Sequence, residues 1–340
     1  MIRVPSDVDE IRRDCPTIHG DLIFARSLRE SINLDGIFIV EGDIRYQGCE
    51  MECPTEGTIP PFNITSTTLN TVKGNLTIKP WLQGLETLIL PNLKAVGGTF
   101  EIMSQWNLTY MDITNLESVG SFQLDAPELT TMHHRELKNV TGWKDGKVRG
   151  EGSVFIYSAN VESVDSLFSN PIDLKGSEIG CYSLPNVNNL TLGVTRAGDV
   201  IIECGNGELH LILGSPSTTS MEMKSLRFTG VKEFTRGPTV TNITTGTFSV
   251  VSNNSLTDLT VPFDQLSILE VFYQHQLQRL QLPPQAVGWT LLDLFIDLCP
   301  KLDMTSQYAM YNGKKVQTWY WPQKDIKAIN IDGNIGDGFL

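Results

Sequence analysis

An internal repeat constrains the fold of this 340-residue chain more than any other feature. Each repeat begins with a glycine that precedes alternating apolar residues, as in Gly20-Asp-Leu-Ile-Phe24. The same pattern begins at Gly42, Gly74, Gly98, Gly120, Gly152, Gly198 and Gly246. Successive glycines are 22, 32, 24, 22, 32, 46 and 48 residues apart, which indicates a period of 22–24 residues with two insertions of about ten. A fixed period of this length is typical of solenoids, in which each coil packs only on its neighbours.

The alternation of apolar residues predicts short β-strands that are too short to be stable alone. A second strand in several coils ends in a Leu-Pro pair, as in Leu88-Ile-Leu-Pro91 and Leu280-Gln-Leu-Pro283. Proline donates no hydrogen bond to a ladder, so we expect it at the end of a strand. We expect the glycines to turn corners at which φ is positive. Stacked coils of this kind form parallel sheets, with neighbouring coils about 4.8 Å apart.

Both ends of such a stack need covers, because the terminal coils expose apolar edges. Ser6–Asp14 has helical spacing, and we expect Ser6 as its N-cap with Asp9 at the capping-box position. This helix would lie across the first coil. An aromatic cluster near the other end would plug the last coil, in preference to stacking on sugar rings: Tyr308, Tyr311, Trp319, Tyr320 and Trp321.

The overall charge excludes several classes of partner. The formal net charge is −13, which opposes contact with nucleic-acid phosphates or with anionic lipid. Only 19% of the residues are charged, and the 40% apolar content is too high for a disordered chain. No apolar run reaches the roughly 18 residues of a membrane span.

The sequence contains seven Asn-x-Ser/Thr sequons, whereas random placement of its acceptors would give about three. We favour N-glycosylation, over chance in a Thr-rich β protein, at Asn63, Asn75, Asn107, Asn139, Asn189, Asn242 and Asn253. A glycosylated chain passes through an oxidising compartment. The sequons therefore indicate that the protein is extracellular.

The six cysteines form no metal-binding pattern, and in an oxidising compartment we favour disulfides over buried thiols. Cys181 and Cys204 are 23 residues apart, about one period, which would place them at the same position of adjacent coils. Cys15 would meet Cys49 or Cys53, and a Cys49–Cys53 bridge with Cys15 free is the alternative. Cys299 lies too many coils away to reach the N-terminal cysteines of a straight solenoid.

Catalytic and metal-binding patterns are weak. Glycosidases need two carboxylates about 5–9.5 Å apart, and Glu101 has Gln123 rather than a carboxylate at the matching position of the next coil. We interpret Asp21, Asp43 and Asp199 as solvated or turn-capping side chains. The His133-His134 pair is interpreted as a surface turn. We predict no catalytic residue, no metal site and no cofactor.

The N-terminal segment Asp7-Val-Asp-Glu-Ile11, followed by Cys15-Pro-Thr-Ile-His-Gly-Asp-Leu22, resembles the start of a receptor L domain, as in insulin- and epidermal-growth-factor-receptor ectodomains. The segment Leu88–Ile102 is similar to the repeat of a fungal branch of cell-surface glycoproteins of the GPI-anchored, cell-wall-organisation type. The resemblance covers about residues 2–310, and Trp319–Pro322 and Asp332–Gly336 look like the juxtamembrane end of such ectodomains.

This resemblance implies a right-handed parallel β-solenoid of the receptor L-domain or leucine-rich-repeat-like β-helix type. We expect two L-domain-like halves, 1–150 and 151–310, and a C-terminal cap or juxtamembrane segment, 311–340. It further implies a non-enzymatic glycoprotein of the cell surface, cell wall or outer face of the plasma membrane. Its partner would be a wall glycan or a surface protein.

The chain shows neither a leader nor an anchor, so we expect an ectodomain whose ends are missing, held to the membrane by a GPI signal or a span outside this sequence. Two alternatives stay open. One is a carbohydrate-active β-helix enzyme, a polysaccharide hydrolase or lyase. The other is a ligand-binding receptor ectodomain.

Overall fold

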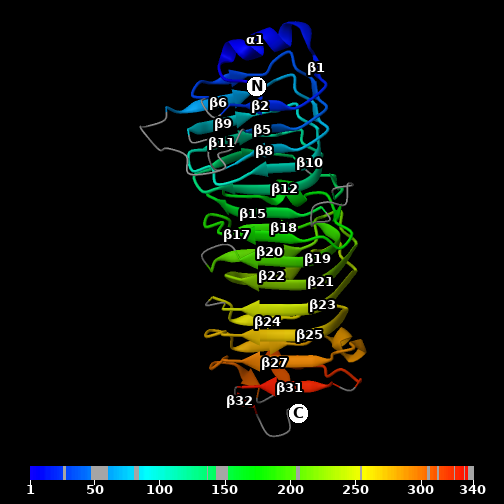
Figure 1. Cartoon of the computed structure of the whole chain (residues 1–340). Helices are drawn as coiled ribbons and strands as arrows, with labels where there is room; N and C mark the ends of the chain where they lie inside the picture. The colour runs from blue at the N-terminus through cyan, green and yellow to red at the C-terminus, as the bar shows by residue number, and fades with distance from the viewer. Residues whose placement is uncertain are drawn as a thin grey trace. The chain divides into compact units, whose positions relative to one another are not determined.

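The computed structural model describes residues 1–25, 28–46, 60–79, 84–135, 137–142, 152–203, 207–252, 255–304, 307–311, 314–324, 326–332 and 334–335. The chain forms two compact units, Met1–Glu178 and Ile179–Leu340. In each unit, short strands stack coil upon coil (Figure 1), and the chain makes about 11 turns in all. The predicted parallel β-solenoid is therefore confirmed, whereas the predicted boundary between halves at residue 150 stays a prediction.

The first unit carries two parallel sheets, to which successive coils contribute strands. One sheet contains β1 (Thr17–Ile18), β2 (Leu22–Phe24), β4 (Ile39–Val40), β5 (Ile44–Tyr46), β7 (Thr71–Val72), β8 (Leu76–Ile78), β10 (Ala95–Ile102), β12 (Ser118–Ala126), β14 (Asn139–Val140), β15 (Val154–Ala159) and β16 (Ile172–Asp173). The other contains β3 (Ile32–Asn33), β6 (Phe62–Thr65), β9 (Leu85–Ile89), β11 (Tyr110–Asp112) and β13 (Thr131–His133). A 3₁₀ turn, η1, spans Asp165–Phe168.

The strand register of the first sheet follows the repeat in the sequence. The first apolar residue after each repeat glycine pairs with its equivalent in the next coil, in the order Leu22, Ile44, Leu76, Phe100, Phe122 and Val154. All six side chains are buried, and the rings of Phe100 and Phe122 stack with centroids 5.3 Å apart. Each coil therefore adds one layer to a continuous apolar core. Glu101 pairs with Gln123, as the repeat predicts.

The one α-helix among the described residues is α1 (Pro5–Asp14), at the N-terminal end of the first unit (Figure 1). It begins one residue earlier than predicted, and the predicted cap is wrong. The N-cap is Val4, and Asp7 at N3 accepts hydrogen bonds from the backbone N–H groups of Arg3 (2.6 Å) and Val4 (3.2 Å). Proline fits the first helical position because that N–H needs no partner. Val8 is buried beneath the helix, which covers the first coil.

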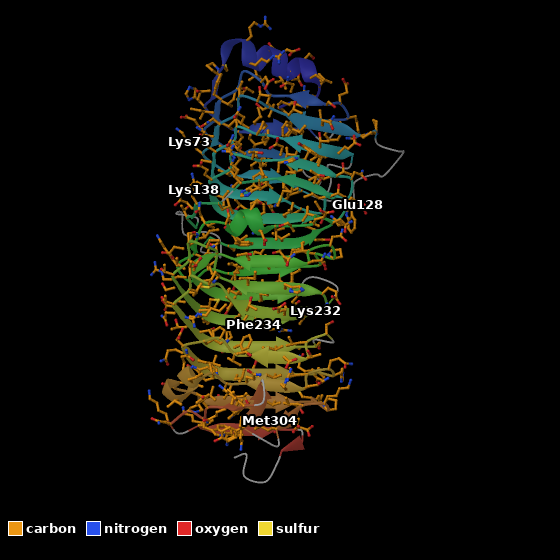
Figure 2. All side chains as sticks on the ribbon, turned by 180° about the vertical axis from the view of Figure 1, so that it is seen from behind. Lys73, Glu128, Lys138, Lys232, Phe234 and Met304 are labelled. Carbon is orange, nitrogen blue, oxygen red and sulfur yellow. The ribbon has the colours of Figure 1, made fainter. Side chains whose placement is uncertain are left out.

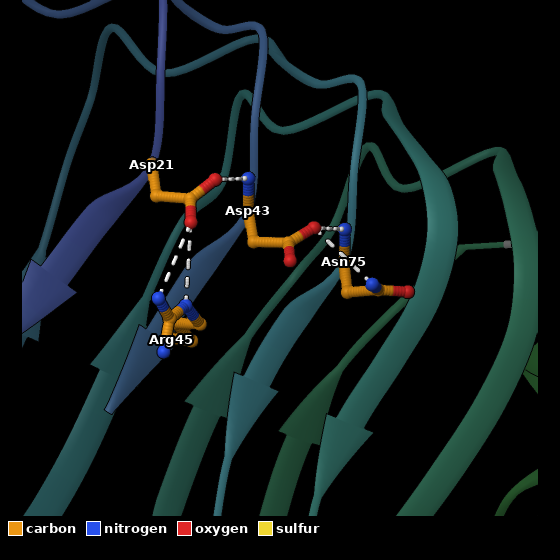
Figure 3. A network of polar contacts seen from close by, with 4 residues as sticks. All are labelled: Asp21, Asp43, Arg45 and Asn75. Atoms are coloured by element: carbon orange, nitrogen blue, oxygen red, sulfur yellow. Dashed lines mark hydrogen bonds and ion pairs between the residues drawn. The ribbon is translucent and has the colours of Figure 1, made fainter. Parts of the chain in front are cut away.

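A polar ladder joins the coils beside the repeat glycines (Figure 3). Asp21 Oδ1 accepts the backbone N–H of Asp43 at 3.0 Å, and Asp43 Oδ1 accepts the backbone N–H of Asn75 at 2.7 Å. Asn75 Oδ1 in turn accepts the backbone N–H of Thr99 at 2.9 Å. The turn-capping interpretation of Asp21 and Asp43 is thus confirmed. In the second unit Asp199 accepts a hydrogen bond from the Ser225 hydroxyl at 2.7 Å.

Glycine is required beside this ladder for a reason other than the one we expected. The repeat glycines Gly42, Gly74 and Gly98 do not have positive φ. Instead, a Cβ at Gly74 would collide with Asp43 Oδ1 and would lie 2.7 Å from the carbonyl oxygen of Gly42. Gly42 and Gly98 are crowded in the same way by Asp21 and Asn75. The capping side chain of one coil occupies the space that a Cβ of the next would need.

The second unit continues the same design with longer strands. Its largest sheet contains β17 (Ile179–Tyr182), β19 (Val194–Glu203), β21 (Ser220–Thr229), β23 (Asn242–Val251), β25 (Gln265–Phe272), β27 (Asp293–Asp297) and β31 (Ala328–Ile331). The smaller ladders are β18 (Asn189–Leu192), β20 (Leu209–Leu213) and β22 (Val231–Arg236); β24 (Asp258–Thr260) and β26 (Arg279–Gln281); β28 (Asp303–Met304) and β32 (Asn334–Ile335); and the antiparallel β29 (Tyr308–Tyr311) and β30 (Lys314–Gln317). A 3₁₀ turn, η2, spans Pro284–Gly288.

The aromatic residues near the C-terminus have different environments. Trp319 is buried, and its ring meets that of Trp321 edge-on at 5.3 Å. Tyr320 is half-buried. Tyr308, in contrast, is exposed on the β29–β30 hairpin, where the Lys315 ammonium lies 4.3 Å from its ring centroid. Packing of the kind expected of a plug therefore holds for the tryptophans but not for Tyr308, and the side chain of Tyr311 lies outside the described residues.

Candidate functional site

A groove of about 690 Å³ opens in the second unit where one ladder stops and another begins. β18, β20 and β22 form one ladder, and β24 and β26 form the next. Within the described residues no ladder joins β22 to β24, although β21, β23 and β25 pair continuously in the large sheet of the same coils. Residues of β22 and of β24 line the groove.

A β-bulge precedes the break. Leu209 of β20 pairs with Val231, whereas the next residue, His210, pairs with Glu233, so Lys232 is an extra residue in β22. A bulge bends its strand, redirects side chains and can terminate pairing. The bulged strand β22 is also the last strand of its ladder.

Phe234 is the aromatic residue of the groove lining, and its side chain is only 8% exposed. It stacks on Phe248 with centroids 5.4 Å apart and also contacts Phe228 at 5.1 Å and Phe263 at 6.3 Å. This packing fixes the ring. Figure 2 labels Lys232 and Phe234 at about the same level of the second unit.

Ion pairs and hydrogen bonds hold the polar side chains of the groove walls. His210 Nδ1 lies 2.7 Å from a Glu233 carboxylate oxygen, and Lys232 pairs with Glu208. Arg236 pairs with Asp264 at 2.9 Å and donates to the carbonyl oxygens of Val240 and Pro262. The guanidinium is thus fixed by three acceptors at one end of the groove.

Asp258 is the carboxylate of β24 at the groove. A hydrogen bond from Arg279 holds the pKa of Asp258 below its usual value; a hydrogen bond from the Thr257 hydroxyl acts in the same direction, and burial opposes both. A general acid for glycoside cleavage needs a raised pKa, so Asp258 does not have that character. The hydroxyls of Thr235, Ser255, Thr257 and Thr260 complete the wall. One aromatic residue among hydroxyl and charged groups suits a polyhydroxylated ligand.

The repeat pattern of the sequence did not predict this groove. The local signal is the sequence Val231-Lys-Glu-Phe-Thr-Arg236, in which two successive charged residues, Lys232 and Glu233, interrupt the alternation of apolar and polar residues. A bulge shifts the chain by one residue, which a repeat of 22–24 residues with variable loops conceals.

Four sequon asparagines are exposed on the surfaces of the coils. Asn107 lies in a turn, and Asn139, Asn189 and Asn242 are the first residues of β14, β18 and β23. Asn63 is half-buried in β6, and its amide oxygen is buried without a hydrogen-bond partner in the structure. Asn253 lies outside the described residues.

Asn75 has another role in the structure. Its amide nitrogen donates to Asp43 at 3.1 Å while its amide oxygen accepts from Thr99 at 2.9 Å. A glycan on this nitrogen would place a bulky sugar within the polar ladder. The structure therefore opposes modification at Asn75.

The structure tests the cysteine predictions only in part. Cys15 is exposed and free in the structure, whereas Cys49 and Cys53, its predicted partners, lie outside the described residues. Cys181 is buried and pairs in register with Ile202, so the coil here has 21 residues rather than 23. Cys204 also lies outside the described residues, and both pairings stay predictions. Cys299 is buried, with its sulfur 3.4 Å from the carbonyl oxygen of Asp297.

The interpretation of both histidines as a surface turn is wrong for His134. His133 is exposed at the end of β13 and its ring lies 5.4 Å from that of Tyr110, but His134 is only 9% exposed. Burial lowers the pKa of His134 to about 4, against a smaller opposing effect of the Leu116 backbone. Neither ring nitrogen makes a hydrogen bond of good geometry. Across the described ranges no group of three or more potential metal ligands comes together.

Comparisons with known proteins identify no relative. No family model, no curated protein and no solved structure matches this chain. In the part of the chain that the structure describes, no helix has both the length and the apolar character that a membrane span requires.

Proposed function

We propose that the protein is a non-enzymatic extracellular glycoprotein of the cell surface, which presents a rigid binding surface in the organisation of a fungal cell wall. The observation that carries this proposal is the exposure of Asn107, Asn139, Asn189 and Asn242, each in a sequon that uses threonine. Surface positions are those that a glycosyltransferase reaches and that tolerate a bulky sugar. The receptor L-domain resemblance supports the cell-wall role, and anchoring through a segment outside this chain belongs to the same proposal.

The ligand we propose is a wall glycan in the groove between β22 and β24. A sugar presents a ring of C–H groups to an aromatic face and hydroxyls to its surroundings. Phe234 offers the exposed part of its ring, and Thr235, Thr257 and Asp258 offer hydrogen-bonding groups beside it. Because Arg236 and Phe234 are held by packing and hydrogen bonds, the groove is preorganised, which lowers the entropic cost of binding.

Binding fits the groove better than hydrolysis does. Its two carboxylates are engaged: Glu233 with His210, and Asp258 with Arg279. The lowered pKa of Asp258 opposes proton donation to a leaving group. We therefore place the binding protein ahead of the carbohydrate-active enzyme, and a signalling receptor has no separate observation in its favour.

Titration calorimetry with soluble β-glucan and chitin oligosaccharides tests the ligand. We expect Thr257→Val and Asp258→Asn each to weaken binding about 5–10-fold, the value of one lost hydrogen bond. Thr219→Val, at an exposed hydroxyl outside the groove, is the matched control and should bind as the wild type does. Equal affinities in all four proteins, or no binding of either glycan, would refute the proposed ligand.

A further inference from the structure

A second hollow, of about 410 Å³, lies in the first unit beside the sequon of Asn107. Trp106 forms part of its lining and is 64% exposed, more than any other large apolar side chain among the described residues. Asn107 is itself part of the lining. The hollow and the attachment point of a predicted glycan are therefore the same place.

The chain holds Trp106 and Asn107 in a fixed turn. Leu108 donates its backbone N–H to the carbonyl oxygen of Gln105 at 3.4 Å, so the two residues form the tip between them. Gln105 is only 2% exposed, and its amide donates to the carbonyl oxygens of Lys79 at 2.9 Å and Met103 at 2.8 Å. Leu108 is fully buried. Buried residues on both sides thus anchor an exposed tip.

Two carboxylates face the same hollow from neighbouring coils. In the next coil, Leu129 donates to the carbonyl oxygen of Ala126 at 3.0 Å, which forms the equivalent turn and places Glu128 at the position that Asn107 has here. Glu86 comes from the preceding coil, where its carbonyl oxygen accepts the backbone N–H of Thr109 at 2.9 Å. Figure 2 shows Glu128 on the opposite edge of this unit from Lys73 and Lys138. No ion pair of Glu86 or Glu128 is found within the described residues.

We infer that this hollow is the seat of the protein's own N-glycan, with the first sugar of the Asn107 glycan packed on the indole of Trp106. An N-linked sugar offers C–H groups to the indole face, and its hydroxyl and acetamido N–H groups donate to the carboxylates of Glu86 and Glu128. The volume lies within the range of about 300–1,000 Å³ that ligand pockets have, enough for the first sugars of a chain. The tether at Asn107 raises the effective concentration of that ligand.

This inference rests on the proposed extracellular glycoprotein. It also explains why an indole stands in the open at the tip of a turn: the glycan covers it. The sugar and the protein would then stabilise each other, since removal of the glycan exposes the indole to water.

Hydroxyl-radical footprinting of the full glycosylated chain, read by mass spectrometry, tests the seat directly. We expect the oxidation of Trp106 to rise at least threefold after enzymatic removal of the glycans, and to the same degree in Asn107→Gln. Asn139→Gln, which removes an exposed sequon elsewhere, should leave Trp106 protected. Phe38, which is 48% exposed, should oxidise equally in every sample.

A second measurement uses thermal unfolding. Loss of the Asn107 glycan should lower the Tm of the transition by about 2–4 °C in the wild type and by less than about 1 °C in Trp106→Ala. A glycan at Asn107 in the glycopeptide map, with equal oxidation of Trp106 before and after its removal, would overturn the inference and leave the proposed function intact. If Asn107 carries no glycan while Asn139, Asn189 and Asn242 do, the inference is likewise overturned and the proposed function stays intact. A chain without any glycan would overturn both.

Discussion

The same substitution should have opposite effects at two equivalent glycines of the repeat. Gly74→Ala adds a Cβ that collides with Asp43 Oδ1 and lies 2.7 Å from the carbonyl oxygen of Gly42. Gly20 has the equivalent position in the first coil, and a Cβ there meets nothing within 4 Å. Neither glycine has positive φ, so backbone strain does not separate the two variants.

The magnitudes follow from the contacts of Asp43. Relief of the collision at Gly74 moves the Asp43 carboxylate away from Asn75. In the wild type this carboxylate accepts hydrogen bonds from the backbone N–H of Asn75 at 2.7 Å and from its side-chain amide at 3.1 Å. Loss of one hydrogen bond to a charged group costs about 1.5–3 kcal/mol, and crowding of the backbone adds about 1–3 kcal/mol. Lower entropy of the unfolded chain returns about 0.4–1 kcal/mol. Gly74→Ala should thus destabilise by about 1.5–5.6 kcal/mol, whereas Gly20→Ala should stabilise by about 0.4–1 kcal/mol.

Urea unfolding followed by circular dichroism gives the free energies, and native-state hydrogen exchange locates the change. Exchange should accelerate at the backbone N–H of Asn75 in Gly74→Ala and stay unchanged in Gly20→Ala. In Asp43→Ala, addition of Gly74→Ala should cost less than in the wild type, because one collision partner is gone. Equal effects at the two glycines, or a stabilised Gly74→Ala, would refute the close approach as the reason for glycine.

Two further predictions concern buried side chains. The pKa of His134 is lowered from 6.5 to about 4, so the unfolded chain binds the proton more readily than the folded chain does. The contribution of neutral His134 to the free energy of unfolding should therefore be fully present above about pH 7. It should fall by about 3 kcal/mol as the pH drops from 6.5 to 4. The difference in unfolding free energy between wild type and His134→Leu should change over this range, while the difference for the exposed His133→Leu stays flat; two flat differences would contradict the buried His134. Burial raises the pKa of the Cys299 thiol, so iodoacetamide should label Cys15 in the native chain and Cys299 only after unfolding. Labelling of Cys15 that requires prior reduction would instead support its predicted disulfide.

The repeat made the architecture predictable because coil length, strand spacing and burial all follow from one period. The apolar residues after Gly20, Gly42 and Gly74 align as expected, since a slip of one residue would expose the whole set. The role of the repeat glycines was harder to predict from the sequence. Composition cannot distinguish a corner with positive φ from a site that the capping side chain of the previous coil crowds.

The candidate site depends on local changes of one or two residues, which a repeat period of 22–24 residues does not reveal. A one-residue bulge at Lys232 lies in a strand that lines the groove, and a coil of 21 residues places Ile202, not Cys204, opposite Cys181. The sequons were visible in the sequence, but only the structure separates the exposed Asn189 from Asn75, whose amide is bound within the polar ladder. Local register, which loops and bulges set, accounts for these differences.

Site-resolved glycopeptide mass spectrometry of the protein from its own cells tests the central proposal most directly. The proposal predicts N-glycans at Asn107, Asn139, Asn189 and Asn242, and an unmodified Asn75. Unmodified asparagine at all of the first four would contradict the extracellular glycoprotein.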